Sequence, residues 1–389
     1  MSEQTVAVRG TILEWARKQA GYSIEEVAAA LNKDPAIIAS WENENSDSAP
    51  TYVQLEKLAY SLYKRPLAIF FLPQPPDEPA LKNSFRTLPD FEIESLEPDT
   101  RYALRYARAL QLSLAELNEG VNPSEKKIFT DIHFRRTSNV PAVARQVRQY
   151  LGVPLDQQIA LQNSEEALKF WRDKVEQVGI FVFKRSFKQK DISGFCLLDE
   201  QFPLIYLNNS AAKSRQIFTV FHELAHILSH INGITKANDS YINALPKPER
   251  EIEQLCNAFA GEFLVPSGDF ERRIKSIRVD DESVSTLANV YKVSREVILR
   301  KLLDKGLVDK QYYEEKAAEW IKEYLESQSE SGGGNYYQTQ AAYLSKTYMD
   351  LVFGKYYSGQ LSVQEVADHL GIKASSVPGL EHVFSRSGS

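Results

Sequence analysis

Residues 221–226 read Phe-His-Glu-Leu-Ala-His, and this stretch decides how the centre of the chain is interpreted. It is an HExxH pattern within a segment, about residues 211–231, whose apolar side chains predict a long buried helix. Side chains four residues apart project from one face of a helix, so His222 and His226 could bind one Zn²⁺ ion together. Glu223 lies beside them and could accept a proton from an attacking water molecule. The pattern therefore predicts a zinc hydrolase.

A catalytic zinc site needs a third protein ligand and an open position. In the pattern HExxHxxGxxH the third ligand is a histidine, but here Ser229 and Asn232 stand in place of the glycine and that histidine. His230 follows on the same helix and is poorly placed to complete the site. We expect it to cap the helix end or to support the ligands, so the third ligand must come from elsewhere.

A second helix, predicted over about residues 248–264, offers that ligand. At 100° per residue, Glu253 lies on the face that carries the apolar residues, whereas Glu251 and Glu262 lie on the opposite face. Glu249 also lies inward. An acidic residue is expected in the first turn of a helix in any case, because it stabilises the helix dipole. Glu253 is the predicted third ligand and Glu249 is the alternative.

The paired motifs resemble the ImmA/IrrE family of metallopeptidases. FTVFHELAHILSH (218–230) and ExxCNAFAGEFLVP (253–266) are similar to the family pattern HELGH followed by E-x-x-A-N-x-F-A-x-x-L-L-x-P. Residues 205–209 and 215–219 also resemble the family, and the similarity covers roughly residues 140–308. The chain departs from the pattern at Ala225, Cys256 and Phe263, which we interpret as small changes on the packing face.

The resemblance implies that His222, His226 and Glu253 bind zinc and that Glu223 is the general base. Zinc would polarise the scissile carbonyl and lower the pKa of a water molecule, and Glu223 would pass the proton to the leaving amine. His230 and Tyr241 are candidates for stabilising the oxyanion, although a structural role is expected for each.

Residues 9–65 resemble the Cro/repressor-type helix-turn-helix, on the stretches SIEEVAAALNKDPAIIASWENE (23–44) and APTYVQLEKLA (49–59). Ser23 with Glu26 predicts a capping box at the start of one helix. Asp34 followed by Pro35 predicts the start of the next helix, with aspartate as its N-cap. These signals predict a helix-turn-helix domain over residues 1–74.

Whether this domain binds DNA is left open by its charge. The residues predicted to face DNA are Lys33, Ala36, Ser40 and Asn43. The segment 1–74 has 7 basic and 9 acidic residues, a net charge of −2, whereas contacts to phosphate dominate DNA affinity. A protein-docking domain of the same shape is the alternative.

Two further segments are similar to residues 23–31, which resemble the first helix of a helix-turn-helix unit. Residues 23–31 and 362–370 share the pattern S-[IV]-x-E-V-A-x-x-L, and residues 283–291 are a looser match. Residues 283–310 have 6 basic and 3 acidic residues, so DNA contact there is one reading and a solvated helix face is the other. Five of these six basic residues are the candidate DNA contacts: Lys292, Arg295, Arg300, Lys301 and Lys305.

The organisation of the chain follows from these motifs. We predict an α+β, mostly helical fold: a five-helix helix-turn-helix domain, a zincin-like metallopeptidase core with a small three-stranded sheet near residues 179–207, and a C-terminal helical region. The predicted segments are the helix-turn-helix (1–74), a linker and helical connector (75–137), the peptidase core (138–270), a helix-turn-helix-like segment (271–326), a flexible linker (327–335) and a helical tail (336–389).

Composition narrows the class of protein. The 389 residues carry a net charge of −6, which excludes a strongly basic nucleic-acid protein but not a local basic face. Two cysteines without a CxxC pattern exclude a disulfide framework and indicate a reducing compartment. No apolar run is long enough to cross a bilayer, and the N-terminus lacks a signal-peptide pattern. We expect a cytoplasmic protein without a membrane partner.

Two functions are compatible with the sequence. The first is a zinc-dependent regulatory endopeptidase that cleaves an intracellular protein, by resemblance a DNA-binding repressor or an antitoxin. The second is a DNA-binding regulator, or the antitoxin-like half of a two-gene module, in which the zinc fold is not proteolytic. The presence of Glu223 favours the enzyme, because a purely structural zinc site does not need a general base.

Overall fold

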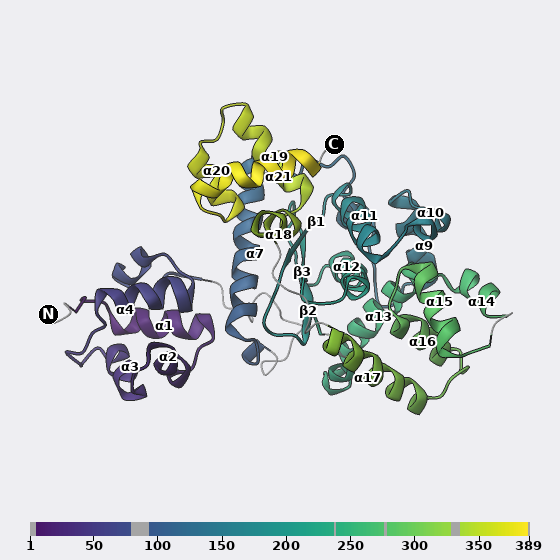
Figure 1. Cartoon of the computed structure of the whole chain (residues 1–389), viewed down its shortest axis with the longest axis horizontal. Helices are drawn as coiled ribbons and strands as arrows, with labels where there is room; N and C mark the ends of the chain where they lie inside the picture. Colours follow the sequence, from purple (N-terminus) through teal and green to yellow (C-terminus); the bar gives the residue numbers. More distant parts are fainter. Residues whose placement is uncertain (1–4, 79–92, 237–238, 276–277, 328–334, 388–389) are drawn as a thin grey trace. The chain divides into compact units, whose positions relative to one another are not determined.

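The structure is a computed structural model that describes residues 5–78, 93–236, 239–275, 278–327 and 335–387. The chain divides into two compact units, Met1–Tyr106 and Ala107–Ser389, which are described separately. The described residues are mostly helical and contain one sheet, so the predicted α+β, mostly helical class is confirmed (Figure 1). Residues 328–334 of the predicted flexible linker lie outside the described part of the chain.

The first unit begins with a bundle of short helices around a small core of buried aliphatic and aromatic side chains. The predicted five helical segments are present if α4 and η1, which are continuous, count as one. The elements are α1 (Gly10–Ala20), α2 (Ile24–Leu31), α3 (Pro35–Glu42), α4 (Tyr52–Glu56), the π-helical η1 (Lys57–Tyr63) and the 3₁₀ turn η2 (Leu67–Phe71).

Local capping determines where α2 and α3 begin. The predicted capping box is confirmed, because the Ser23 hydroxyl accepts from Glu26 N–H and the Glu26 carboxylate accepts from Ser23 N–H. Asp34 caps α3 as predicted. The guanidinium of Arg17 on α1 donates two hydrogen bonds of 2.7 Å to the Glu42 carboxylate at the end of α3. This largely buried bidentate pair fixes α3 against α1.

The second unit is built on a four-stranded sheet with the order β1-β3-β2-β4. β1 and β3 are parallel and the other pairs are antiparallel. The strands are β1 (Phe181–Arg185), β2 (Ile192–Leu197), β3 (Leu204–Asn208) and β4 (Gly233–Lys236). The prediction of three strands was one short. β4 has only four residues, so it lacks the longer alternating run by which strands are recognised.

Helices cover the sheet on the face that carries Val182, Ile205 and Cys196. Against this face pack α11 (Ser164–Glu176) and α12 (Lys213–Leu228), and α13 (Lys247–Leu264) packs on α12 (Figure 1). The predicted helix over residues 211–231 ends earlier, at Leu228. His230 has a φ of 56°, a left-handed conformation that ends the helix and turns the chain toward β4.

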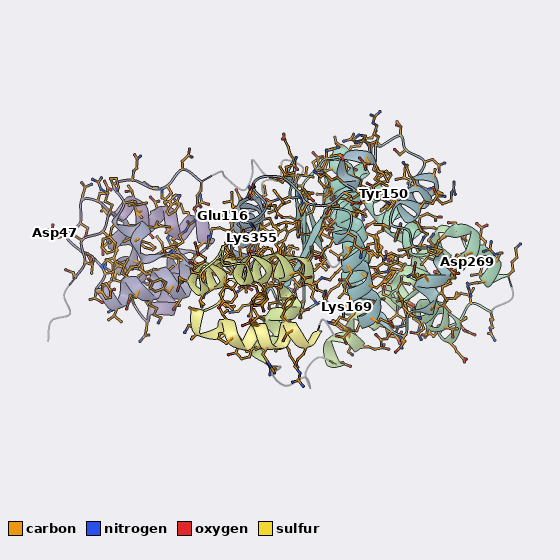
Figure 2. The ribbon with its side chains drawn as sticks, turned by 90° about the horizontal axis from the view of Figure 1, so that it is seen from above. Asp47, Glu116, Tyr150, Lys169, Asp269 and Lys355 are labelled. Atoms are coloured by element: carbon orange, nitrogen blue, oxygen red, sulfur yellow. The ribbon has the colours of Figure 1, made fainter. Side chains whose placement is uncertain are left out.

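Most of the remaining helices belong to the second unit, whereas α7 (Pro98–Leu117) contains the boundary between the two units. The predicted helical region 283–308 is two helices, because Lys292 (φ 59°) interrupts it. Asp269 of α14 (Ser267–Ile274), labelled in Figure 2, accepts a 2.7 Å hydrogen bond from the Tyr291 hydroxyl at the end of α15 (Asp281–Tyr291). This bond joins α14 to α15. The other elements are α8 (Ile128–Asp131), α9 (Val140–Tyr150), α10 (Leu155–Ala160), η3 (Asp239–Ala244), α16 (Arg295–Asp304) and α17 (Lys310–Ser327).

The C-terminal region is helical, as expected, and packs on the second unit. Its helices are α18 (Tyr336–Tyr343), α19 (Lys346–Tyr357), α20 (Val363–Leu370), the turn η5 (Ala374–Ser376) and α21 (Val377–Ser387). The buried Tyr348 ring meets Phe183 of β1 edge-on at 5.4 Å, and the Tyr343 hydroxyl lies 2.9 Å from that of Ser186. Tyr348 therefore forms part of the core of this unit, whereas Tyr343 is only half-buried.

A buried carboxyl group at the end of α11 makes the stability of this unit depend on pH. Glu176 accepts hydrogen bonds from Val182 N–H (3.1 Å) and the Thr347 hydroxyl (2.8 Å), and burial raises its pKa to about 7. Because the folded state then holds the proton more tightly than the unfolded state, this stabilisation is complete below pH 4.5 and is lost as pH rises through about 7. The shift corresponds to about 3 kcal/mol at most.

We expect Glu176→Gln to remove this pH dependence. The measurement is urea unfolding of the wild type and the variant at about pH 4.5 and about pH 8. The wild type should lose about 3 kcal/mol relative to the variant on going to the higher pH. An equal change in both proteins would show that the carboxyl group at this position is not protonated more readily in the folded state.

Candidate metal centre

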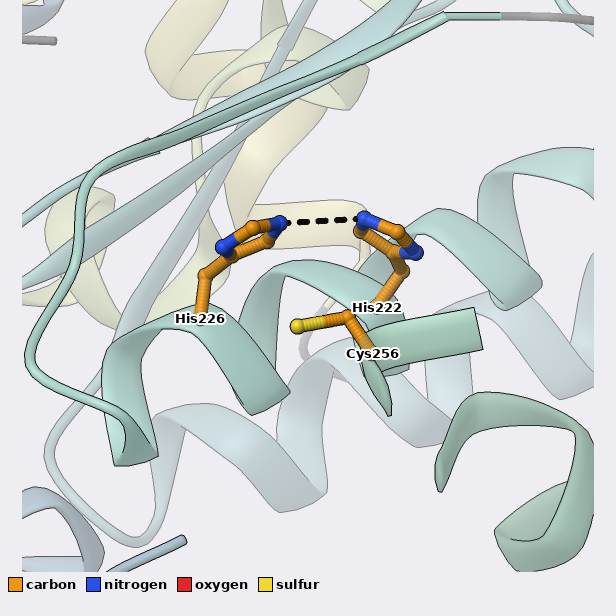
Figure 3. A group of neighbouring side chains, drawn as sticks. All are labelled: His222, His226 and Cys256. Carbon is orange, nitrogen blue, oxygen red and sulfur yellow. Dashed lines mark hydrogen bonds between the residues drawn. The ribbon is translucent and has the colours of Figure 1, made fainter. Parts of the chain in front are cut away.

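Helix α12 places both histidines of the HExxH pattern in the interior of the second unit. Every residue from Gln216 to Leu228 is buried, because the helix lies between the sheet, α11 and α13. His222 and His226 are at most 1% exposed and face the same side. Their Nε2 atoms are 3.1 Å apart, drawn as the dashed line in Figure 3. The helix thus presents two imidazole nitrogens to one point.

Helix α13 brings a carboxylate to the same point. Glu253 Oε2 lies 3.3 Å from His222 Nε2, and Glu253 Oε1 lies 3.3 Å from His226 Nε2. Burial opposes ionisation of Glu253, but the two imidazoles outweigh it and hold the pKa of this carboxyl well below its usual range. Glu249, the alternative ligand, lies one turn earlier on α13 and is only half-buried. Of these two glutamates, Glu253 is the one with a carboxylate oxygen 3.3 Å from the Nε2 atom of each histidine.

Second partners orient the groups that meet here. His222 Nδ1 lies 2.8 Å from Asn257 Oδ1, which orients the ring so that Nε2 points toward His226 and Glu253. The Tyr241 hydroxyl donates a 2.9 Å hydrogen bond to Glu253 Oε2. Tyr241, predicted as a candidate oxyanion partner, is therefore adjacent to this cluster. His230, the other candidate, is exposed at the helix end and lies 3.1 Å from His133.

Glu223 lies beside the cluster with one oxygen held and one oxygen free. Its Oε1 accepts a hydrogen bond from the Thr235 hydroxyl on β4. Its Oε2 is buried and has no hydrogen-bond partner among the described residues. Unpaired buried carboxylate oxygens are costly, so they occur where a function requires them. This oxygen is the one available to accept a proton.

β4 approaches the cluster so closely that only glycine fits at its first position. A Cβ on Gly233 would lie 2.6 Å from His226 Cδ2 and 2.9 Å from Glu223 Oε2. The backbone of Gly233 therefore forms a wall against both functional side chains. The sequence analysis missed this wall and the Thr235 contact, because it did not predict β4.

We expect Gly233→Ala to damage the cluster, because the added methyl group must push either the His226 ring or the Glu223 carboxylate out of place. Overpacking of this kind costs about 1–3 kcal/mol of stability. Zinc affinity should fall by about 10–100-fold, the range seen when supporting groups around a metal are altered. A competition titration with a zinc chelator measures this. Gly261→Ala is the control, since a Cβ on Gly261 meets no atom within 4 Å. Equal zinc affinities of the two variants would contradict this account.

A cysteine also lies at the cluster. The ligand atoms of His222, His226 and Cys256 all lie within 4.8 Å of one another, and Figure 3 shows the sulfur turned toward His226. Burial alone would lower the pKa of His226, but Cys256 and Glu253 raise it well above its usual value. The interpretation of Cys256 as a small packing change was therefore incomplete, because its sulfur reaches the predicted ligands.

The donor set fits a zinc ion. With bonds of about 2.0–2.1 Å, a tetrahedral zinc holds its ligand atoms about 3.3–3.4 Å apart. The two Nε2 atoms are 3.1 Å apart, and each lies 3.3 Å from a different oxygen of Glu253, Oε2 for His222 and Oε1 for His226. Imidazole nitrogen and carboxylate oxygen are also the ligands of catalytic zinc sites.

The residues predicted to contact DNA lie along the turn and the helix α3. Lys33, Ala36 and Asn43 are exposed. Ser40 is half-exposed, and its hydroxyl donates to the Ile37 carbonyl at 2.7 Å. Asn32, with a φ of 54°, makes the turn between α2 and α3. The fold thus presents α3 as an accessible helix of a helix-turn-helix.

Four of the five basic residues considered as DNA contacts in this segment form ion pairs with acidic residues of the same chain. Arg295 lies 2.6 Å from Glu323, and Lys301 lies 2.7 Å from Glu262 on α13. The pair of Lys301 and Glu262 is largely buried. The position of Glu262 on the face opposite the apolar residues suggested a solvated carboxylate, but this carboxylate holds Lys301 instead. Arg300 pairs with Asp304, and Lys305 with Glu271. These pairs support the interpretation of this segment as a structural helix face.

Comparison with known proteins gives a family match for each of two stretches of the chain. Residues 175–303 match a peptidase family, M78, described as the IrrE N-terminal-like domain, and residues 13–59 match a helix-turn-helix family. The chain therefore contains an IrrE-like M78 peptidase domain and an N-terminal helix-turn-helix domain of the repressor type, which confirms the resemblance found in the sequence. This combination is that of a regulator with a DNA-binding fold and a metallopeptidase-like domain.

Other comparisons give less. A Mycobacterium tuberculosis transcriptional regulator of known structure is similar at 17% sequence identity with a TM-score of 0.29. The similarity covers 42% of this chain and 46% of that regulator, so the chain spans less than half of its length. No curated protein matches the chain. None of the described helices is long and apolar enough to span a membrane.

Proposed function

We propose that this chain is a zinc-dependent endopeptidase that cleaves an intracellular protein, such as a DNA-binding repressor or an antitoxin, in the control of transcription. The observation that carries the proposal is the free Oε2 of Glu223 beside a three-ligand cluster. A zinc site with only a structural role does not need this carboxylate. The match to an M78 peptidase family supports the same reading.

In this proposal His222, His226 and Glu253 hold the metal. A zinc ion bound there supplies a Lewis acid that polarises a peptide carbonyl and lowers the pKa of water. Glu223 Oε2 accepts the proton of the attacking water and then delivers it to the leaving amine, while Thr235 holds the other carboxylate oxygen in place. Asn257 fixes the His222 ring. The Tyr241 hydroxyl is close enough to the ligands to serve as a donor to the oxyanion.

The helix-turn-helix domain would bring the peptidase to its site of action. Lys33, Ala36, Ser40 and Asn43 are the proposed DNA contacts, on the exposed face of α3. The net charge of −2 over residues 1–74 argues for modest affinity, because few phosphates are neutralised. Docking of this domain on a DNA-bound repressor would serve the same end.

We expect Lys33→Ala to weaken DNA binding and to reduce the slope of log affinity against log salt concentration by about 0.9, the value for one lost phosphate contact. Fluorescence anisotropy with duplex DNA at several salt concentrations measures both quantities. Lys18→Ala is the control, because Lys18 is paired with Glu14 on α1. An unchanged slope in the Lys33 variant would remove Lys33 from the DNA interface.

The second candidate function is a DNA-binding regulator, or an antitoxin-like partner, in which the zinc fold does not cleave. Two observations favour it. The side chains of the cluster are at most 5% exposed, and Cys256 places a sulfur beside the histidines. A fourth protein ligand would close the coordination sphere, which is the arrangement of structural zinc sites.

The direct test incubates the zinc-loaded full chain with the product of its neighbouring gene, followed by gel electrophoresis. The proposal expects defined fragments that do not form when a chelator is present. A neighbouring repressor that stays intact but binds the chain tightly would favour the non-proteolytic regulator.

A further inference from the structure

A cavity of about 940 Å³ lies in the second unit, and none of the proposed zinc ligands lines it. Residues of α11, β1, the start of α12 and the C-terminal helices line it. Its volume falls within the range of about 300–1,000 Å³ that is usual for small-molecule sites. The zinc peptidase proposal assigns no role to this cavity.

A buried lysine without a partner lies in this cavity. Lys184 is on β1, on the strand face that packs against α11 and α12, and it is 7% exposed. Its ammonium group makes no hydrogen bond or ion pair with any residue in the described ranges. Burial, followed by the charges of Arg172 and Lys213, lowers the pKa of Lys184 to about 7. Lysine is rarely buried unless it is paired, so the position requires a partner.

Three of the neighbouring cations do not have carboxylate partners among the described residues either. Arg172 directs its donors to three backbone carbonyls, those of Val182, Ala342 and Leu344. Lys213, the first residue of α12, also lines the cavity. Lys169 of α11, labelled in Figure 2, lines it as well. Lys346, another cation of the lining, pairs with Asp350 at 3.5 Å, so the positive charge here is only partly neutralised by ion pairs within the described part of the chain.

Four acidic residues also line the cavity, and their own contacts limit what they can offer. Glu166 accepts a 2.7 Å hydrogen bond from Gln162 N–H, and Glu176 is bonded to Val182 and Thr347 with a pKa of about 7. Glu165, exposed on α11, attracts Lys184 but lies beyond ion-pair distance. Asp173 is the fourth, and burial raises its pKa. Six cationic side chains also line the cavity, of which Lys346 pairs with Asp350; the other five are Lys169, Arg172, Lys184, Lys213 and Arg386.

We propose that this cavity binds a small organic anion whose carboxylate or phosphate group pairs with the Lys184 ammonium. The apolar part of the ligand would contact the side chains of Leu168, Leu344 and Met349, which line the same cavity. A charged hydrogen bond to a buried lysine is strong, and the ligand's anionic group replaces the hydration that Lys184 has lost.

The test measures binding of three probes to the full chain by calorimetry and thermal unfolding: inorganic phosphate, hexyl phosphate and hexanoate. At least one of the two probes with an alkyl chain, hexyl phosphate and hexanoate, should bind at millimolar concentration and raise the unfolding temperature. Which of these two binds more tightly identifies the headgroup. Hexyl phosphate should bind more tightly than inorganic phosphate, because the alkyl chain is buried. Failure of all three probes to bind would overturn the proposal.

Lys184→Met tests the assigned residue. Affinity should fall by at least about tenfold, because a charged hydrogen bond is lost. The variant without ligand should unfold at a higher temperature than the wild type, since it buries no unpaired charge. Lys174→Met is the control, because Lys174 does not line the cavity and donates a hydrogen bond to Gln177 instead. This variant should bind the probes as the wild type does. Unchanged affinity in the Lys184 variant would contradict the assignment.

A measurement on the wild type keeps the test independent of the variant's folding. An amine with a pKa near 7 is acylated readily at neutral pH, so Lys184 should react with acetic anhydride and be identified by mass spectrometry. The bound anion should protect it. Labelling of Lys184 that is the same with and without saturating hexyl anion would also overturn the proposal.

Discussion

Glu223→Gln is expected to lower the rate of peptide-bond cleavage by about 10²–10⁴-fold while zinc remains bound. Glutamine has the same shape and can still accept the hydrogen bond of Thr235, but its amide cannot take up a proton. The zinc ligands His222, His226 and Glu253 are unchanged. The measurement is the initial rate of fragment formation from the protein substrate, together with the zinc content of the variant.

Glu251→Gln is the matched control, because Glu251 is exposed on the outer face of α13. It should retain full activity. If Glu223→Gln cleaves as fast as the wild type with the same zinc content, Glu223 is not the general base. A transcriptional response that is unchanged by Glu223→Gln, despite lost cleavage, would instead favour the non-proteolytic regulator.

Glu253→Ala should lower zinc affinity by more than about 100-fold, since loss of a group that only supports a ligand already costs about 10–100-fold. The two histidines would remain, and two ligands on one helix do not complete a zinc site. Competition with a chromogenic chelator measures the affinity. Glu249→Ala provides a sharp comparison, because Glu249 was the alternative ligand and lies on the same helix.

The two variants distinguish the two assignments of the third ligand. We expect Glu249→Ala to bind zinc as the wild type does. Loss of zinc in Glu249→Ala together with retention in Glu253→Ala would mean that α13 presents a different residue to the histidines when zinc is bound.

The parts of the site that were predicted from the sequence are those fixed by helix geometry. The four-residue spacing places His222 and His226 on one face, and the 100° rotation per residue selects Glu253 over Glu251. The apolar residues around each motif then require these faces to be buried against other elements. This is why two short patterns, far apart in sequence, could be expected to meet.

The parts that were missed depend on tertiary contacts that no local pattern encodes. β4 is too short to be recognised, so neither the wall formed by Gly233 nor the hydrogen bond from Thr235 could be foreseen. Cys256 reads as a core residue in any helix pattern, and only the packing of α13 on α12 brings its sulfur to the histidines. Lys184 likewise occupies a strand position whose burial depends on the helices above it.

The central claim is that two imidazoles and one carboxylate from α12 and α13 hold zinc. X-ray absorption spectroscopy of the zinc-loaded full chain tests it most directly. The account predicts one zinc per chain, with the multiple scattering of two imidazole rings and nitrogen or oxygen donors at about 2.0–2.1 Å. A chain that takes up no stoichiometric zinc, or a zinc shell that contains no imidazole, would contradict it.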